Sequence, residues 1–253
     1  MLIHPSIENL KQLRLLSMAK ELESQINQPQ IASLSFEERL GLMIDRELCD
    51  RENRRLQTRL KGSFLKQAAS VEDIDYRASR EIDKKLIFTL ATCQWTKMHR
   101  NVLIVGATGT GKTYMACALA HKACLEGCTV YYGRLSRLLP ELAAARGDGS
   151  YNKTMKRLAK TDVLILDDWG ITPLTDGHRR DLLELLDDRH DKRSTIITSQ
   201  LPIKLWHEAV GDKTLADAIL DRLVHNAYRV DLKGDSMRKI RSEKFNKENK
   251  QEI

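Results

Sequence analysis

The hydrophobic and polar positions of this chain follow two different rhythms, which change near Leu86. Before that point, apolar residues recur three or four positions apart, which is the spacing of one face of an α-helix. After it, short apolar runs alternate with longer helical segments. The pattern therefore predicts a helical module followed by an α/β domain.

The helical module contains two predicted helices. The first is expected to end at Pro29, and its apolar face is formed by Ile7, Leu10, Leu15, Met18, Ala19, Leu22 and Ile26. The second begins at the capping box Ser35-Phe36-Glu37-Glu38, and its apolar face is formed by Phe36, Leu40, Met43, Ile44 and Leu48. A polar stretch from Ala69 to Asp75 follows. We therefore expect an N-terminal helical domain over residues 1–68.

The second part of the chain alternates strands with helices. The predicted strands are Val102–Val105, Thr129–Gly133, Val163–Leu166, Thr195–Thr198 and Tyr228–Leu232. Helical patterns fill Tyr114–Leu125, Leu135–Ala145, Thr154–Lys160, Arg179–Arg189 and Leu215–Ala227. Such alternation is typical of a parallel sheet with helices on both faces. The sequence therefore predicts an α/β fold with a five-stranded parallel sheet over residues 69–235, followed by a basic tail at 236–253.

One loop at a strand end matches the phosphate-binding pattern G-x-x-x-x-G-K-[ST] at every fixed position. Its glycines let backbone N–H groups turn toward phosphates, and the helix that follows adds a partial positive charge. In this interpretation Lys112 reaches the β- and γ-phosphates, and the Thr113 hydroxyl binds Mg²⁺. The pattern thus predicts a nucleoside triphosphate site whose contacts are Gly106, Ala107, Thr108, Gly109, Thr110, Gly111, Lys112, Thr113 and Tyr114.

Further candidate catalytic residues follow the third and fourth predicted strands. Asp167 is expected to hold Mg²⁺ through water, and Asp168 to orient or deprotonate the attacking water. Many ATPases with this phosphate-binding loop carry glutamate where this chain has Asp168. Because the aspartate side chain is one methylene shorter, we expect slow basal hydrolysis that a partner or DNA stimulates. After the fourth strand, Gln200 or Ser199 is placed to sense the γ-phosphate; capping of the strand end is the alternative.

Arg222 lies on the helical pattern Leu215–Ala227, away from its apolar face. A planar, permanently charged guanidinium suits a finger that reaches the γ-phosphate of a neighbouring subunit. The alternative is a simple ion pair with Asp217 or Asp221. Arg238 follows the last strand and is a candidate contact to the phosphates of its own subunit.

A net charge of +7 favours a polyanionic partner. One basic stretch runs from Arg46 to Lys66 and becomes purely basic after Glu52; a second lies between two predicted core strands. Both are candidates for contacts to DNA phosphates, with a solvated helix face as the alternative for the first. The residues singled out are Arg51, Arg54, Arg55, Arg59, Arg134, Arg137 and Lys153.

The remaining composition indicates a cytoplasmic protein with a packed core. Its longest apolar runs are too short to span a bilayer, and no secretory signal is visible at Met1. The five cysteines form no C-x-x-C pair and are interpreted as small apolar residues in a reduced compartment.

Taken together, these residues resemble an AAA+ ATPase of the initiator and helicase-loader clade. More narrowly, the chain is similar to the IstB-like ATP-binding proteins encoded beside transposases in bacterial insertion sequences. The resemblance covers nearly the whole chain and is carried by Leu10–Arg14, Phe36–Gly41, Asn53–Leu56, Val102–Ala120, Leu166–Gly170, Thr198–Pro202 and Leu215–Ala227.

The resemblance implies roles for particular residues. Asp167 and Asp168 would be the Walker B acids, Gln200 would lie at sensor one, Arg222 would be the arginine finger and Arg238 sensor two. The Asp-Asp pair and the glutamine depart from the wider superfamily but are what this narrower family shows. Because few residues follow Gln200, the lid of the AAA+ fold is expected to be minimal or absent.

The resemblance also implies a function: an ATP- and Mg²⁺-dependent homo-oligomer that binds duplex DNA with little sequence preference and assists a transposase encoded by the same element. Two alternatives stay open from the sequence. A replicative-helicase loader like DnaC would prefer single-stranded DNA and dock a helicase through the helix that carries Arg54 and Arg55. A nucleoside or metabolite kinase would share only the phosphate loop and have a small acceptor pocket.

Overall fold

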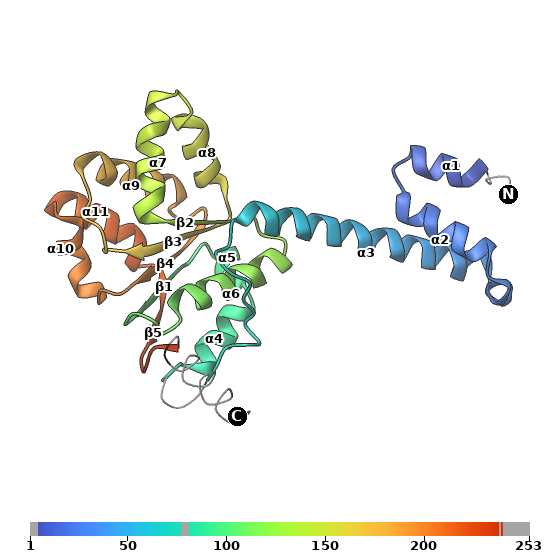
Figure 1. The fold of residues 1–253 in the computed structure, drawn as a ribbon, viewed down its shortest axis with the longest axis horizontal. Coiled ribbons are helices and arrows are strands. Elements are labelled where there is room, and N and C mark those ends of the chain that lie inside the picture. The colour runs from blue at the N-terminus through green and yellow to red at the C-terminus, as the bar shows by residue number, and fades with distance from the viewer. Residues whose placement is uncertain (1–4, 77–80, 238, 240–253) are drawn as a thin grey trace, which may run out of the picture. The chain divides into compact units, whose positions relative to one another are not determined.

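The computed structural model describes residues 5–76, 81–237 and 239. The chain divides into two compact units, of which the first ends at Thr58 and the second begins at Arg59. The division falls within helix α3 (Phe36–Ser63) (Figure 1), so it lies earlier in the chain than the predicted domain boundary after residue 68.

The first unit is helical. It consists of α1 (Pro5–Gln12), α2 (Leu16–Ile26), the 3-10 turn η1 (Pro29–Ser33) and the first part of α3. The single helix expected before Pro29 is in fact two, because the chain turns at Arg14, whose φ is 59°. The capping box is confirmed: the Ser35 N–H donates to Glu38 Oε2 at 2.7 Å, and the Glu38 N–H donates to Ser35 Oγ at 3.2 Å.

A buried carboxylate holds this unit together. Glu47 of α3 accepts the backbone N–H groups of Ser17 and Met18 at the start of α2, at 2.8 and 3.2 Å. Burial raises the pKa of Glu47, but hydrogen bonds from Arg51, Ser17 and Met18 outweigh it, and the pKa lies below its usual value. The charge of Glu47 therefore caps one helix from another.

The second unit is built on a five-stranded sheet in which every neighbouring pair is parallel, as the sequence predicts. Its strands are β1 (Asn101–Gly106), β2 (Val130–Arg134), β3 (Val163–Trp169), β4 (Ser194–Ser199) and β5 (Ala227–Leu232), in the order β2-β3-β4-β1-β5. The central strands are almost wholly buried, which explains why they read as apolar runs rather than alternating patterns.

Helices cover both faces of the sheet (Figure 1). Helix α6 (Lys112–Leu125) packs against the strands on one face, where α4 (Lys84–Ala91) contacts it. The other face carries α7 (Leu135–Gly147), α8 (Tyr151–Lys160), α9 (Asp176–Arg189) and α11 (Lys213–Val224). The remaining elements are α5 (Gln94–Lys97), η3 (Ile203–Leu205) and α10 (Trp206–Val210). The two layers of helix thus bury the sheet between them.

Two sequence expectations about these elements need correction. The helical pattern Leu215–Ala227 ends at Val224, because Ala227 already opens β5 and pairs with Asn101 of β1. The short helices α4, α5 and α10 are not predicted by the sequence pattern. In the part of the chain that the structure describes, no helix is long and apolar enough to cross a membrane.

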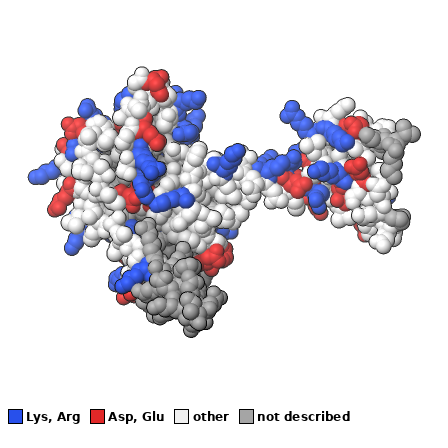
Figure 2. All heavy atoms as spheres, in the orientation of Figure 1, with Lys and Arg blue, Asp and Glu red and all other residues white. Residues whose placement is uncertain are grey.

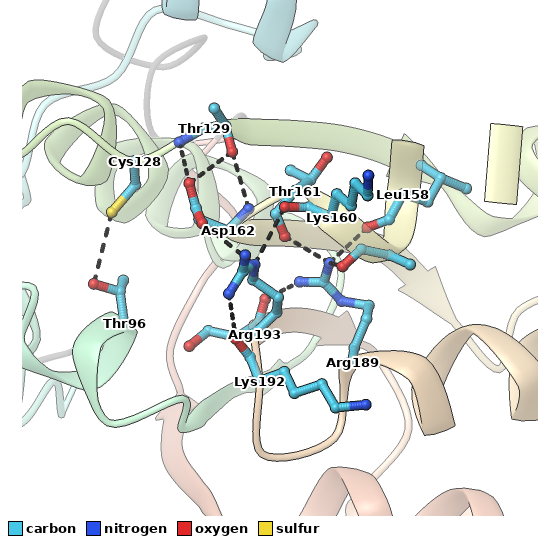
Figure 3. A network of polar contacts seen from close by, with 12 residues as sticks. Thr96, Cys128, Thr129, Leu158, Lys160, Thr161, Asp162, Arg189, Lys192 and Arg193 are labelled. Atoms are coloured by element: carbon cyan, nitrogen blue, oxygen red, sulfur yellow. Dashed lines mark hydrogen bonds and ion pairs between the residues drawn. The ribbon is translucent and has the colours of Figure 1, made fainter. Parts of the chain in front are cut away.

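A buried arginine joins three elements at the amino ends of the strands (Figure 3). Arg189 is 1% exposed and donates from Nη1 to the carbonyl oxygens of Leu158 and Thr161 at 2.6 and 2.7 Å. Its Nη2 donates to the carbonyl of Ser194. The guanidinium thus satisfies carbonyls that the end of α8 and the start of β4 leave unpaired. Next to it, Asp162 accepts two hydrogen bonds from Thr129 and lies 3.4 Å from Arg193 Nε.

Candidate active site

The glycine-rich loop lies at the carboxyl end of β1, as predicted. A Cβ atom at Gly106 would lie 2.3 Å from the carbonyl oxygen of Leu232, so only glycine fits. Gly109 has a φ of 85°, a conformation that side chains rarely tolerate. Lys112, 6% exposed, begins α6 and donates from Nζ to the carbonyl of Ala107 at 2.8 Å. A cation and a helix N-terminus therefore meet inside the loop, which is the arrangement that binds phosphates.

A cavity of about 400 Å³ opens beside this loop. Its size falls within the range of small-ligand pockets. Gln200 lies at its edge and accepts a hydrogen bond from Thr108 Oγ1 at 2.5 Å. The cavity is lined by Lys66, Gln67, Asp73, Asp75, Thr108, Gly109, Gly111, Lys112, Thr113, Tyr114, Arg134, Asp168, Gln200 and Met237. The structure thus brings most of the predicted nucleotide contacts to one place; Tyr114 is among them.

Asp167 is fully buried at the end of β3 and is surrounded by hydroxyl groups. Its Oδ1 accepts from Thr113 at 3.0 Å and from Thr198 at 2.5 Å, and its Oδ2 accepts from Tyr132 at 2.6 Å. A carboxylate next to a threonine hydroxyl offers the oxygen ligands that Mg²⁺ prefers. The predicted pair Thr113 and Asp167 is therefore together, and its chemistry fits that ion.

Asp168 is the second carboxylate at this strand end and has a strained backbone, with a φ of 67°. Its N–H donates to Thr198 Oγ1 at 3.1 Å, and its Oδ2 lies 2.9 Å from Arg134 Nε. Thr198 therefore contacts both acids. Tyr132 and Thr198 were not predicted as site residues. Each lies toward the carboxyl end of a predicted strand, and Thr198 also opens the segment Thr198–Pro202 that carries part of the resemblance.

Arg134, which the sequence offers as a candidate contact to DNA phosphates, has a partner within the chain. It lies at the end of β2, in the wall of the cavity, and its Nε is 2.9 Å from Asp168 Oδ2. The side chain therefore lies beside the acid pair, at the carboxyl edge of the sheet. In the sequence, Arg134 lies between two predicted strands and just before two helical segments with basic residues. That context does not distinguish a contact to DNA from a contact to Asp168.

Arg222 lies at the opposite, amino end of β1. The Asn101 side chain donates to the carbonyl of Arg222 at 3.0 Å, and the six residues of β1 separate that point from the phosphate loop by roughly 17–20 Å. The guanidinium pairs with Asp187 of α9, with Nε and Nη2 each 2.7 Å from Oδ1. The expected partners were wrong, since Asp217 and Asp221 lie near His207 and His225 instead. Arg222 thus cannot reach its own phosphate loop.

The chain after β5 returns to the phosphate loop. The Met237 N–H donates to the carbonyl of Gly109 at 2.9 Å, and Ser236 packs against the same glycine. Arg238, the predicted phosphate contact from this segment, lies outside the described residues. Ahead of the core, Asp75 lines the cavity, next to Tyr76, whose ring centroid is 6.2 Å from that of Phe88.

The predicted DNA contacts fall into two groups. Arg51 and Arg54 lie 2.7 and 3.4 Å from Glu47 Oε1, and Arg59 Nε donates to the carbonyl of Cys124 at 3.0 Å. These three therefore have structural partners, which the charge run alone does not reveal. The second group is Arg55, Arg137 and Lys153, whose side chains are exposed, as that of Arg54 also is.

Comparisons with known proteins agree with this geometry. A family model described as IstB-like ATP binding protein matches residues 8–245. An insertion sequence ATP-binding protein of Sinorhizobium fredii is 48% identical over 94% of this chain and 98% of its own length. An ATP-binding protein of insertion sequence IS1162 from Pseudomonas fluorescens is 51% identical over 80% of this chain and 88% of its own length.

The fold has counterparts among solved structures. The DnaC helicase loader aligns with a TM-score of 0.53 at 20% identity, covering 65% of this chain and 97% of that chain. At this identity the likeness shows the fold alone, which is that of the P-loop AAA+ proteins. The phosphate loop, the acid pair and the family match together establish that this chain belongs to the family of IstB-like ATP-binding proteins.

Proposed function

We propose that this chain is a bacterial, cytoplasmic AAA+ ATPase that assembles on duplex DNA in the presence of ATP and assists a transposase encoded by the same insertion sequence. The observation that carries the proposal is the convergence of three residues on one cavity, Lys112, Thr113 and Asp168, with the buried Asp167 hydrogen-bonded to Thr113 behind it. Its family membership, and relatives named as insertion sequence ATP-binding proteins, support the cellular role.

In this proposal the residues divide the work of ATP hydrolysis. Lys112 and the loop backbone hold the β- and γ-phosphates, while Thr113 and Asp167 would hold Mg²⁺, which neutralises developing charge when bound. Asp168 orients the attacking water and accepts its proton. Gln200, bonded to Thr108, is placed to detect the γ-phosphate. The hydrogen bond between Gln200 and Thr108 would thus connect detection of the γ-phosphate to the phosphate loop.

The slow basal hydrolysis that we propose would follow from the ion pair between Arg134 and Asp168, because it occupies the carboxylate that would orient the attacking water. We predict that Arg134→Ala raises the DNA-free hydrolysis rate roughly tenfold, since releasing one charge-assisted hydrogen bond frees about 1.5 kcal/mol. Steady-state phosphate release measures this. Arg137→Ala, which removes an exposed arginine three positions later, should leave the rate unchanged. A rate that falls in Arg134→Ala would make Arg134 a catalytic residue instead.

Helix α8 is the best-supported DNA surface. Tyr151, Met155 and Leu158 bury one face of α8, and the opposite face exposes four basic side chains at helical spacing with no acidic residue in the helix: Lys153, Lys156, Arg157 and Lys160. Basic side chains gather over this part of the molecule (Figure 2). Phosphate contacts of this kind give affinity without sequence preference, which suits a protein that accompanies DNA of any sequence.

A double substitution tests this surface. Lys153→Ala with Lys160→Ala should weaken duplex binding and lower the slope of log affinity against log salt by about 1.8, because each lost phosphate contact contributes about 0.9. Fluorescence anisotropy at several salt concentrations measures the slope. Lys85→Ala with Lys204→Ala removes two exposed charges elsewhere and should not change it. An unchanged slope in the α8 variant would place the DNA on another surface.

A helicase loader is the second candidate function, since DnaC shares the fold. The two candidates differ in the nucleic acid that stimulates hydrolysis. We expect duplex DNA together with the transposase to raise the hydrolysis rate, and single-stranded DNA of equal length to have little effect. Stimulation by single strands and by a replicative helicase, without an effect of the transposase, would favour the loader.

A further inference from the structure

Strand β2 carries two neighbouring tyrosines that point to opposite sides of the sheet. The ring of Tyr131 makes an edge-on contact with Phe64, 5.6 Å between centroids, and receives the Arg157 guanidinium at 5.1 Å. Tyr132 instead donates its hydroxyl to Asp167 Oδ2 at 2.6 Å. One residue therefore serves packing and its neighbour contacts the buried carboxylate of the candidate active site.

The hydroxyl of Tyr132 has a particular place among the groups around Asp167. Thr113 and Thr198 both donate to Oδ1, at 3.0 and 2.5 Å. Among the described residues, Oδ2 accepts its shorter hydrogen bond from Tyr132, at 2.6 Å, and a longer one from Thr113, at 3.3 Å. A carboxylate held at both oxygens cannot rotate freely, so Tyr132 helps to fix the plane of the Asp167 carboxylate beside Thr113.

Tyr132 is suited to act as a donor to Asp167. Its hydroxyl carries one proton to donate and lies 2.6 Å from Oδ2 of that carboxylate. The ring is only half-buried and its strand lies at the edge of the sheet. The half-buried ring thus packs at the sheet edge while its hydroxyl reaches the buried carboxylate of Asp167.

We propose that Tyr132 is a positioning residue that holds Asp167 in the orientation required to bind Mg²⁺ beside Thr113. The inference rests on the proposed ATPase function. Groups that orient metal-holding side chains through hydrogen bonds commonly change metal affinity 10- to 100-fold when they are removed. Tyr132 would act on metal affinity and leave nucleotide contacts intact.

The test is Tyr132→Phe, which removes one oxygen and keeps the ring. Binding of Mn²⁺ to the protein–ADP complex, followed by electron paramagnetic resonance, is expected to weaken about tenfold. The half-saturating Mg²⁺ concentration for hydrolysis should rise by the same factor, while the maximal rate at saturating Mg²⁺ and the affinity for ADP without metal stay near the parent values. A purely structural role would lower thermal stability and leave the metal requirement unchanged.

Two further variants separate the outcomes. Tyr131→Phe removes the neighbouring hydroxyl and should leave Mn²⁺ binding unchanged. Replacement of Tyr132 by p-aminophenylalanine retains a hydrogen-bond donor at the same place and should keep the parent's metal affinity. This variant also tests the inference if Tyr132→Phe does not fold. Parent-like Mn²⁺ binding in folded Tyr132→Phe, or weak binding in the p-amino variant, would overturn the inference alone. A parent protein that binds ADP but no Mn²⁺ would instead overturn the proposed function.

Discussion

Lys112→Ala is expected to weaken ATP binding about 100-fold and to abolish measurable hydrolysis, because charged hydrogen bonds to phosphate contribute about 1.5–3 kcal/mol each. In the present structure the Lys112 ammonium is already directed into the loop, where the Ala107 carbonyl accepts it at 2.8 Å. Titration with a fluorescent ATP analogue and an assay of phosphate release measure the two effects.

The control for this prediction is Lys122→Ala. Lys122 lies on the same helix and pairs with Glu126 at 2.8 Å, away from the cavity, so its loss should change neither affinity nor rate. Thermal unfolding shows whether Lys112→Ala is folded. Normal ATP affinity and hydrolysis in a folded Lys112→Ala protein would disprove the whole site assignment.

Arg222→Ala is expected to lower hydrolysis at least about 1,000-fold while ATP still binds, since an arginine finger contributes about 10³–10⁵ in rate. The reason is geometric: Arg222 lies at the far end of β1 from its own phosphate loop, so in the proposed oligomer its guanidinium would act at the site of a neighbouring subunit. The ATP-dependent assembly should fail as well. Sedimentation with an ATP analogue and phosphate release measure both effects.

Two controls distinguish a finger in trans from a lost internal ion pair. Asp187→Ala removes the partner of Arg222 and should keep most of the activity if the pair is only structural. Mixing inactive Lys112→Ala with inactive Arg222→Ala should restore part of the activity, because the first supplies intact fingers and the second intact phosphate loops. An Arg222→Ala monomer that hydrolyses ATP normally would exclude the finger role.

The parts of the site that the sequence predicts are those set by local pattern. The loop from Gly106 to Thr113, the strand before it and the acids at 167 and 168 form short motifs whose placement follows from strand–helix alternation. The sheet is five-stranded and parallel for the same reason. The end of the predicted helix Leu215–Ala227 is wrong, because α11 ends at Val224 and Ala227 begins β5. Asn226 and Ala227 carry no strong signal that would end a helix.

The parts that the sequence does not predict depend on contacts between distant segments. Tyr132 and Asp167 are brought together by the pairing of β2 with β3, and Arg134 reaches Asp168 by the same pairing. Likewise, the spacing of Glu47 and Arg51 permits an ion pair within α3, but nothing local indicates that the same glutamate caps α2. A charge run shows how many basic residues are present, and only the fold shows which of them already have partners.

The most direct test of the central claim is sedimentation of the pure protein with a duplex of several tens of base pairs. The comparison is between no nucleotide, ADP and a non-hydrolysable ATP analogue, each at low and high salt. We predict large protein–DNA complexes only with the ATP analogue, and fewer of them at high salt. A monomer that ignores duplex DNA under all these conditions would contradict an ATP-gated, DNA-assembling ATPase.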